Sequence, residues 1–158
     1  MRFHQTLPCP DEAAMQLFGR QLAGALTNGT LLTLQGELGA GKSVLARAII
    51  HAAGYVGRVK SPTYTLIETY TIDPPLSGLA QIAHLDLYRL ADPDELNYLG
   101  FDEVLDSHDL VIIEWAERAG DLLPTADVRI LIDYAEGGGR IVTIESDTCY
   151  GSLQSLSD

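Results

Sequence analysis

The residues of this sequence that are best suited to chemistry form one short glycine-rich segment. Residues 36–43 read GELGAGKS and match the pattern G-x-x-x-x-G-K-[ST]. Glycines let successive backbone N–H groups point at one anion, and a lysine at this spacing places its charge on the outer phosphates. The last residue offers a hydroxyl to a magnesium ion. The sequence therefore predicts a phosphate-binding loop that consists of Gly36, Glu37, Leu38, Gly39, Ala40, Gly41, Lys42 and Ser43.

The segments that flank this loop have the hydrophobic periodicity of a strand and a helix. Residues 31–35 read LLTLQ, which predicts a buried strand that runs directly into the glycines. From Lys42 onward, apolar residues recur at three- and four-residue spacing and predict a helix that Gly54 ends. The amino end of that helix would direct its positive dipole at a bound anion. Because this is the context that a phosphate loop requires, we expect a nucleotide to bind here.

Two acidic residues at the ends of predicted strands are suited to metal binding and catalysis. Besides a phosphate loop, nucleotide hydrolysis needs a carboxylate for the metal ion and a group that orients the attacking water. Asp86 lies at the end of a predicted strand over residues 79–87, and Glu114 ends the aliphatic run at 110–114. Glu114 has the cleaner metal-site pattern, but the spacing leaves open which of the two acids is the main ligand.

Three further residues could reach the site. Thr63 lies in the segment KSPTYT at 60–65, where a hydroxyl could sense the third phosphate, although this sequence is also ordinary loop chemistry. Trp115, which follows Glu114, is either a core residue or a partner contact at the mouth of the site. His84 would share a strand face with Asp86. For His84 a core position with satisfied hydrogen bonds is the favoured interpretation, and a supporting role behind the site is the alternative.

The remaining pattern predicts an α/β domain with three layers and a mixed central β-sheet. We assign residues 1–145 to this domain and residues 146–158 to a polar C-terminal tail that frays. The other predicted elements are a helix over 10–27, a strand over 65–72, a short helix that starts at 92–96 with Asp92 as its cap, and a hairpin formed by 128–134 and 140–145.

Composition limits the classes of partner. The chain has 158 residues, 22 acidic and ten basic ones, and a formal net charge of −12. A protein that gripped phosphate backbones by itself would need a dense basic surface, so direct nucleic-acid binding is not expected. The sequence shows no apolar core of a signal peptide, no apolar run long enough to cross a membrane and no paired cysteine motif. These observations predict a cytoplasmic protein.

Taken in order along the chain, the motifs resemble one protein family. GELGAGKS at 36–43, SPTYTL at 61–66, HLDLYRL at 84–90 and IEW at 113–115 are similar to motifs of the TsaE (YjeE) family, the bacterial ATPase of tRNA threonylcarbamoyladenosine biosynthesis. The resemblance extends from about residue 6 to residue 145, which is nearly the whole chain. Its middle motifs are more specific than the phosphate loop.

The resemblance implies a cytoplasmic, P-loop NTPase-like protein that binds ATP and Mg²⁺ and hydrolyses ATP weakly when alone. Its partners would be the TsaB and TsaD proteins, and it would meet tRNA only through that complex, supporting repeated turnover of the transfer reaction. Residue by residue, Lys42 would bind the outer phosphates, Ser43 and Glu114 the metal, and Asp86 would assist hydrolysis. The segment near Thr6 and the first helix would lie by the adenine. The resemblance also implies that Thr63 belongs to the switch segment and that Trp115 lies near the active site.

Four alternatives differ in class. A small GTPase would carry N-K-x-D and D-x-x-G motifs, which this sequence lacks. A transporter-type ATPase would need a second glycine after LSG at 76–78, where Leu79 stands. A small P-loop kinase would need arginines around the transferred phosphate; Arg47, Arg58 and Arg89 could serve. A non-catalytic switch, in which ATP binding assembles a complex, stays open because Asp86 and Glu114 suit a metal site whether or not turnover matters.

Overall fold

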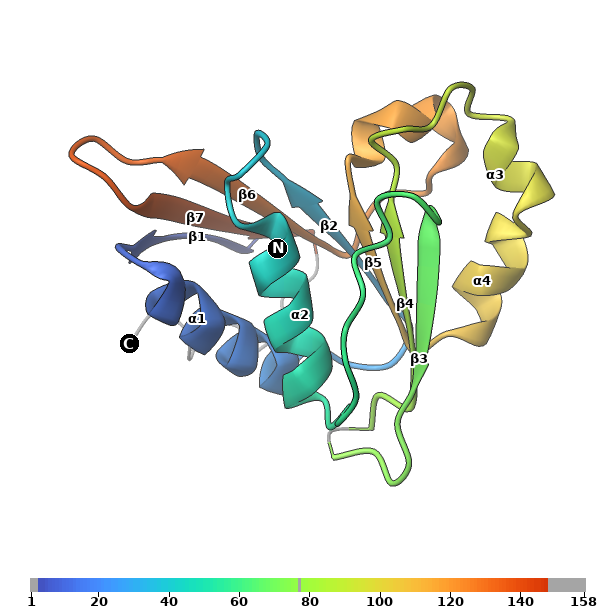
Figure 1. Ribbon diagram of the computed structural model, residues 1–158, viewed down its shortest axis with the longest axis horizontal. Coiled ribbons are helices and arrows are strands. Elements are labelled where there is room, and N and C mark those ends of the chain that lie inside the picture. Colours follow the sequence, from blue (N-terminus) through green and yellow to red (C-terminus); the bar gives the residue numbers. More distant parts are fainter. Residues whose placement is uncertain (1–2, 77, 148–158) are drawn as a thin grey trace.

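One mixed sheet of seven strands organises the chain. The structure, a computed structural model, describes residues 3–76 and 78–147. The strands run in the order β1-β7-β6-β2-β5-β4-β3 (Figure 1). Their bounds are Phe3–Cys9 for β1, Thr30–Gln35 for β2, Ile67–Thr71 for β3, Gln81–Asp86 for β4, Leu110–Glu114 for β5, Val128–Tyr134 for β6 and Arg140–Ser146 for β7.

The centre of the sheet is parallel and its edges are antiparallel. Strands β6, β2, β5 and β4 pair in parallel, whereas β7, β1 and β3 run against their neighbours. Parallel strands end at the same edge of a sheet, which is where open α/β sheets bind ligands. The register places Glu114 of β5 opposite both Leu34 of β2 and Asp86 of β4. The two acids predicted for the site therefore lie next to each other, beside the strand that leads into the phosphate loop.

Helices cover both faces of this sheet. The α-helices are α1 (Glu12–Ala25), α2 (Lys42–Ala52), α3 (Glu95–Tyr98) and α4 (Phe101–Ser107), and a 3₁₀ helix, η1, spans Ala116–Leu122. Figure 1 shows α1 and α2 side by side in front of the sheet, with α3 and α4 on the other side. Alternate residues of one strand point into different cores: Leu32 packs with α1 and α2, while Leu31 packs with the core below α4 and η1. The predicted three-layer α/β architecture with a mixed sheet is confirmed.

The element predictions were correct for the central strands, the two long helices and the hairpin at 128–134 and 140–145, and incomplete elsewhere. Strand β1, helix α4 and η1 were not predicted. The strand expected over 65–72 begins only at Ile67, after a turn. The helix begins at Glu95, and Asp92 caps the turn before it: its carboxylate accepts the Asp94 N–H at 2.9 Å, and its N–H donates to the Glu95 carboxylate at 3.2 Å.

Strand β7 ends one residue beyond the predicted boundary between domain and tail. Ser146 is fully buried as the last residue of β7, so it belongs to the sheet. The remainder of the proposed tail, from residue 148 onward, lies outside the described residues. No helix within the described ranges is both long and apolar enough to cross a membrane.

Candidate functional site

The glycines of the segment at 36–43 are required by its shape. Gly39 and Gly41 have φ angles of 79° and 115°, which favour glycine over other residues. A Cβ on Gly36 would lie 2.8 Å from the carbonyl oxygen of Ile132. Helix α2 starts directly after Gly41 without a side-chain cap, so no side chain satisfies the first N–H groups of the helix. The segment thus forms a tight loop that leads into the amino end of a helix, the arrangement that binds phosphate.

The ammonium group of Lys42 lies within the loop. The residue is only 5% exposed, and its Nζ donates to the carbonyl oxygen of Gly36 and, at 3.1 Å, to that of Glu37. The Nζ atom also lies 4.2 Å from the ring centroid of Trp115, close enough for a cation–π contact. Burial lowers the pKa of Lys42, while the carboxylates of Glu114 and Asp86 oppose this shift. The charge is therefore held at the loop by carbonyl groups and an aromatic face.

Glu114 and Ser43 face each other across the site. Both carboxylate oxygens of Glu114 are 3.4 Å from the Ser43 hydroxyl, and Glu114 is 2% exposed. Asp86, in the neighbouring strand, is 6% exposed. Burial raises the pKa of Asp86, and the negative charge of Glu114 adds to this rise. Two carboxylates thus stand close together beside the hydroxyl that follows the phosphate-loop lysine.

Thr63 approaches the same pair of acids from a loop. Its hydroxyl donates to a carboxylate oxygen of Asp86 at 3.5 Å and lies 2.7 Å from the Ser61 hydroxyl. The turn is closed by a 2.8 Å bond from the Leu66 N–H to the Pro62 carbonyl, and the Asp86 N–H donates to the Leu66 carbonyl at 3.0 Å. The loop before β3 is therefore attached to the end of β4, which places the predicted switch residue next to the predicted catalytic acid.

The His84 ring contacts Glu114, which is the contact that the alternative interpretation, a supporting role behind the site, requires. Its ring is buried and its Nε2 lies 2.7 Å from a carboxylate oxygen of Glu114. Because an ionised carboxylate only accepts hydrogen bonds, Nε2 carries the proton. The Nδ1 atom is buried and has no hydrogen-bond partner among the described residues. The histidine is thus not a satisfied core residue; it holds the Glu114 carboxylate from behind.

Trp115 lies at the site and not in the centre of a core. It is half-buried, its ring contacts that of Tyr88 with centroids 5.0 Å apart, and its φ angle is 60°. Leu66, with a φ of 68°, is the only other non-glycine residue in the described part of the chain with a left-handed backbone. Strained backbone is concentrated at functional sites, and both of these residues flank the acidic pair. Whether Trp115 contacts a partner stays a prediction.

One cavity brings most of the predicted residues together. It has a volume of about 380 Å³, and its lining includes the loop from Leu38 to Ser43 together with Thr63, Asp86, Glu114 and Trp115. Gly36 and Glu37 do not line it; their carbonyl groups bind Lys42 instead. Sequence reasoning missed Tyr88 and named Arg89 only for the kinase alternative, although both line the cavity and both belong to the HLDLYRL motif.

A second cavity adjoins the other side of the phosphate loop. Its volume is about 210 Å³, and it is lined by residues 9–12, Met15, Gly39–Gly41 and Arg140. Thr6 is not part of this lining, whereas the start of α1 is. Arg140 of β7 was not predicted to matter, yet its guanidinium donates to the carbonyl oxygens of Ala40 at 3.0 Å and Gly39 at 3.1 Å. The β6–β7 hairpin thus braces the phosphate loop.

The comparison with known proteins agrees with this geometry. Residues 9–142 match the family model described as threonylcarbamoyl adenosine biosynthesis protein TsaE. The chain belongs to the TsaE family. The matched range includes the phosphate loop, both acids, Thr63, His84 and Arg140.

Curated TsaE proteins from distant bacteria resemble the chain over most of its length. The protein from Haemophilus influenzae named tRNA threonylcarbamoyladenosine biosynthesis protein TsaE is 40% identical over 140 residues, which cover 85% of each chain. The protein of the same name from Streptomyces coelicolor is 37% identical over 124 residues, which cover 78% of this chain and 81% of its own. The one from Bacillus subtilis is 34% identical over 115 residues, which cover 73% of this chain and 68% of its own.

A solved structure shares the TsaE fold seen here. The crystal structure of Bacillus subtilis YdiB superposes with a TM-score of 0.79 and covers 99% of this chain and 96% of its own. Its sequence identity is 24%, so this match supports the fold alone.

Proposed function

We propose that this TsaE protein is a magnesium-dependent ATPase of tRNA threonylcarbamoyladenosine biosynthesis. One observation carries the proposal: the phosphate-loop residues Lys42 and Ser43 lie in one cavity with the buried carboxylates Glu114 and Asp86. Phosphoryl transfer to water needs a minimal set of groups. These are a cation for the phosphates, a hydroxyl and a carboxylate for the metal, and a second carboxylate near the terminal phosphate.

The residues present fit a magnesium ion. Magnesium prefers oxygen ligands and usually keeps waters and substrate phosphate oxygens beside one or two carboxylates. Ser43 and Glu114 supply such oxygens 3.4 Å from each other. No group of three or more His, Cys, Asp or Glu side chains among the described residues could hold a metal by itself, so nucleotide oxygens would complete the ligand set. When bound, the ion would neutralise charge on the outer phosphates.

The protein's own groups then divide the remaining work. Lys42 exchanges its carbonyl partners for phosphate oxygens, and His84 keeps the Glu114 carboxylate oriented. In this proposal Asp86, whose pKa is raised by burial, accepts a hydrogen bond from the attacking water. Thr63, bound to Asp86 at 3.5 Å, belongs to the loop that would respond to the third phosphate. The second cavity, next to Gly39–Gly41, is the place for the nucleoside.

The biological role follows from the relatives' names and the motif resemblance. Proteins named for tRNA threonylcarbamoyladenosine biosynthesis are up to 40% identical to this chain over most of its length. The chain would act with TsaB and TsaD and support many rounds of transfer to tRNA, while its own contribution is ATP hydrolysis. The net charge of −12 suits a subunit that leaves tRNA binding to its partners.

The decisive experiment measures tRNA threonylcarbamoylation over many turnovers, using TsaB and TsaD from the same organism, with and without this chain and ATP. Product should remain near one per complex without the chain and accumulate with it. Lys42→Ala should abolish the gain, because the outer phosphates lose their cation. If the wild-type chain makes no difference, the proposed role is wrong and a metabolite screen for a phosphorylated product would test the kinase alternative.

Asp86→Ala distinguishes an ATPase from a non-catalytic assembly switch. Removal of this carboxylate should leave ATP binding intact, since Lys42, Ser43 and Glu114 remain, and should stop product accumulation after the first round. Full activity of the assembled system with Asp86→Ala would show that binding suffices and that hydrolysis is incidental.

A further inference from the structure

Arg89 is a cation at the active-site cavity that the proposed function does not use. The residue is exposed, yet it lines the same cavity as Lys42, Asp86 and Glu114. Its guanidinium carbon lies 4.6 Å from the ring centroid of Tyr64, so it stacks on the ring. No ion pair or hydrogen bond from its guanidinium is seen within residues 3–76 and 78–147. Its donors are therefore available to a ligand.

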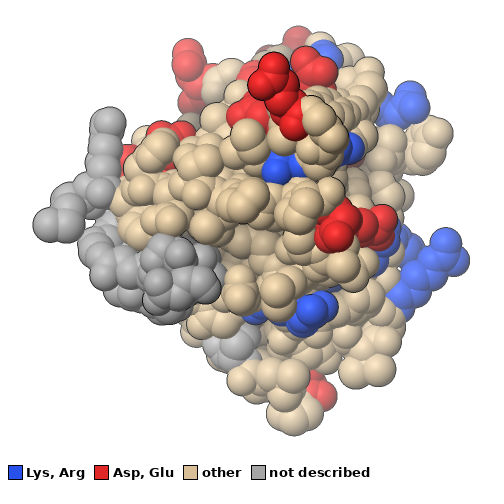
Figure 2. All heavy atoms as spheres, turned by 90° about the vertical axis from the view of Figure 1, so that its left-hand side faces the viewer, with Lys and Arg blue, Asp and Glu red and all other residues tan. Residues whose placement is uncertain are grey.

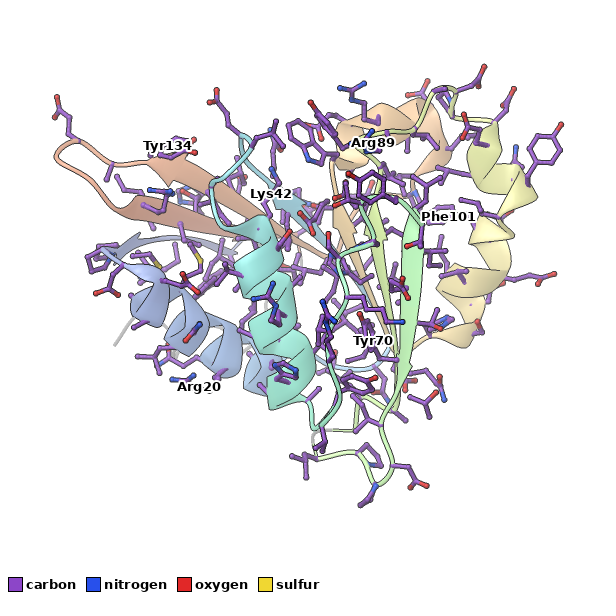
Figure 3. All side chains as sticks on the ribbon, viewed as in Figure 1. Arg20, Lys42, Tyr70, Arg89, Phe101 and Tyr134 are labelled. Carbon is purple, nitrogen blue, oxygen red and sulfur yellow. The ribbon has the colours of Figure 1, made fainter. Side chains whose placement is uncertain are left out.

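The backbone of Arg89 is fixed while its side chain can turn. The Tyr88 N–H donates to the Asp86 carboxylate at 3.0 Å, and the Leu90 N–H donates to the Leu87 carbonyl at 3.0 Å. These bonds on either side of Arg89 set its Cα position relative to Asp86. Figure 3 shows Arg89 and Lys42 at the same end of the sheet, where the parallel strands finish. A guanidinium on a fixed turn beside the catalytic acid can reach a ligand without any movement of the sheet.

The charge of the cavity explains why a second cation is needed. Two carboxylates, Asp86 and Glu114, face one ammonium group, Lys42, so the protein side without Arg89 is net negative. A magnesium-bound nucleoside triphosphate is also negative, and charge develops further on its terminal phosphate and leaving oxygen during transfer. Arg89 is the only basic side chain besides Lys42 in the lining of this cavity.

Other nearby arginines are occupied differently. Arg140 donates to the carbonyl groups of Ala40 and Gly39 on the far side of the loop. Arg118 lies over the ring of Tyr88 at 5.5 Å and is not part of the cavity lining. Neither could add charge at the third phosphate without leaving these contacts, and this makes Arg89 the best placed of the three.

We propose that Arg89 binds the terminal phosphate of ATP and stabilises the charge that develops there, and that the Tyr64 ring holds its guanidinium at the cavity mouth beforehand. The inference rests on the proposed ATPase function. In the step, the oxygen of water forms a bond to the terminal phosphorus while the bond from phosphorus to the bridging oxygen breaks. The bridging oxygen keeps the electron pair, ADP and phosphate form, and one water proton is released to solvent.

The test compares ligands with and without an occupied third-phosphate position. Affinities for Mg²⁺–ADP, Mg²⁺–ADP with aluminium fluoride, and a non-hydrolysable ATP analogue are measured for the wild type, Arg89→Ala and Arg89→Lys. Arg89→Ala should leave ADP affinity unchanged and weaken the aluminium fluoride complex by roughly 100-fold or more, as for loss of one transition-state donor. Arg89→Lys should be intermediate, because an ammonium keeps the charge but lacks the planar fork. Arg118→Ala is the matched control and should behave as wild type.

The outcomes separate this inference from the proposed function. If Arg89→Ala weakens the binding of ADP and of the aluminium fluoride complex equally, Arg89 has a structural role. If it weakens the binding of neither, Arg89 has no role. Either result overturns the inference. The ATPase proposal fails instead if the wild type binds nucleotide but does not hydrolyse ATP with its partners, and if aluminium fluoride does not increase its affinity for Mg²⁺–ADP. The ratio of the affinity for the ATP analogue to the affinity for ADP, compared between Arg89→Ala and the wild type, would then still decide whether Arg89 contacts the third phosphate.

The part assigned to Tyr64 has its own pair of variants. Tyr64→Phe keeps the ring and should retain more ATPase activity than Tyr64→Ala. Tyr64→Ala removes the surface on which the guanidinium rests and should slow hydrolysis, though less than Arg89→Ala does. An equal loss in both Tyr64 variants would show that the hydroxyl matters, and would contradict the stacking role.

Discussion

The hydrogen bond between His84 and Glu114 links the predicted metal ligand to the core of the protein. Both side chains are buried, and the bond of 2.7 Å is the only one made by the His84 ring in the described structure. Groups that orient a metal-binding carboxylate from behind affect metal affinity strongly even though they never touch the metal. We therefore expect His84 to act as a positioning residue for Glu114.

Replacement of His84 should alter the magnesium requirement more than nucleotide binding. His84→Leu removes the donor, so the magnesium concentration for half-maximal ATPase activity should rise by about 10- to 100-fold. His84→Gln can place an amide N–H near the position of Nε2 and should recover part of this loss. His108→Gln, at the end of α4, serves as the control. An unchanged magnesium dependence in His84→Leu, in a folded protein, would contradict the positioning role.

Asp86 gives a prediction on stability and pH. Burial raises its pKa, so the folded state binds a proton there more readily than the unfolded state. The free energy of unfolding therefore decreases as pH rises from the ordinary aspartate pKa through the raised folded value, and the ionised side chain costs stability above that range. Asp86→Asn should raise the thermal midpoint at neutral pH while abolishing hydrolysis.

The measurement for Asp86→Asn is a series of thermal unfolding curves from neutral to acidic pH. The advantage over wild type should shrink as pH falls through the raised pKa of Asp86 and disappear below the ordinary aspartate range. Asp133→Asn, on the exposed part of β6, should show no such trend. A gain that is the same at every pH would mean that ionisation of Asp86 is not its cause.

At the scale of elements, the position of the phosphate loop depends on the close contact of α1 with α2. A Cβ on Gly19 of α1 would lie 2.6 Å from the Cβ of Ala48 on α2, so only glycine allows this separation. Helix α2 carries Lys42 and Ser43 at its start. The contact thus holds the helix that carries the two predicted phosphate- and metal-binding residues.

Two glycines of α1 should respond in opposite directions to alanine. Gly24 is exposed, and a Cβ added there would have no other atom within 4 Å, so Gly24→Ala should stabilise the protein by about 0.5–1 kcal/mol through helix propensity. Gly19→Ala must push α1 away from α2 and should destabilise by about 1–3 kcal/mol, as overpacking does. Urea unfolding of both variants checks this. A stabilising Gly19→Ala would disprove the close helix contact.

The hairpin of β6 and β7 braces the phosphate loop from outside. Besides the two bonds from Arg140, the Tyr134 hydroxyl donates to the Leu38 carbonyl at 2.9 Å. Arg140→Ala should weaken nucleotide affinity by roughly 10-fold, because charged hydrogen bonds to the loop backbone are lost. Titration with a fluorescent ADP analogue measures the effect. Arg129→Ala, whose side chain pairs with Asp147, is the control on the same hairpin, and equal losses in both variants would argue against bracing.

At the scale of the whole molecule, charge separates nucleotide binding from nucleic-acid binding. The net charge is −12, and Figure 2 shows separate basic side chains among acidic and uncharged ones on the face that it presents. The proposed nucleotide site would need no general positive potential, because a glycine loop, a helix end and the local cations Lys42 and Arg89 would suffice. Binding of a long polyanion would need a continuous basic surface.

Labelled tRNA should therefore not bind this chain alone at physiological salt. Fluorescence anisotropy at about 0.15 M salt should show no saturation below about 100 μM protein, weaker than typical non-specific nucleic-acid binding. The same tRNA with the TsaB–TsaD complex is the positive control. Micromolar binding by the isolated chain would disprove the expectation that tRNA is met only through partners.

Much of the fold was predictable because its signals are local. The aliphatic runs at Leu31 and Leu110 and the glycines before Lys42 specify the central strands and the loop within a few residues. Strand β1 was missed because Phe3–Cys9 contains Pro8 and only weak alternation, and it gains its partner from β7 at the other end of the chain, where Phe3 pairs with Ser146. Segments that become regular only through distant pairing leave little trace in their own sequence.

The sequence by itself determined the phosphate loop, the two strand-end acids and the α/β class, because these depend on residue type and short spacing. Only the tertiary structure decided that Glu114 faces Ser43, that His84 holds Glu114, and that the Tyr64 ring receives the guanidinium of Arg89. Each of these contacts joins residues that are many positions apart. They exist because the parallel strands β2, β4 and β5 end at the edge of the sheet where the antiparallel strand β3 begins, and that alignment is a property of strand order and register.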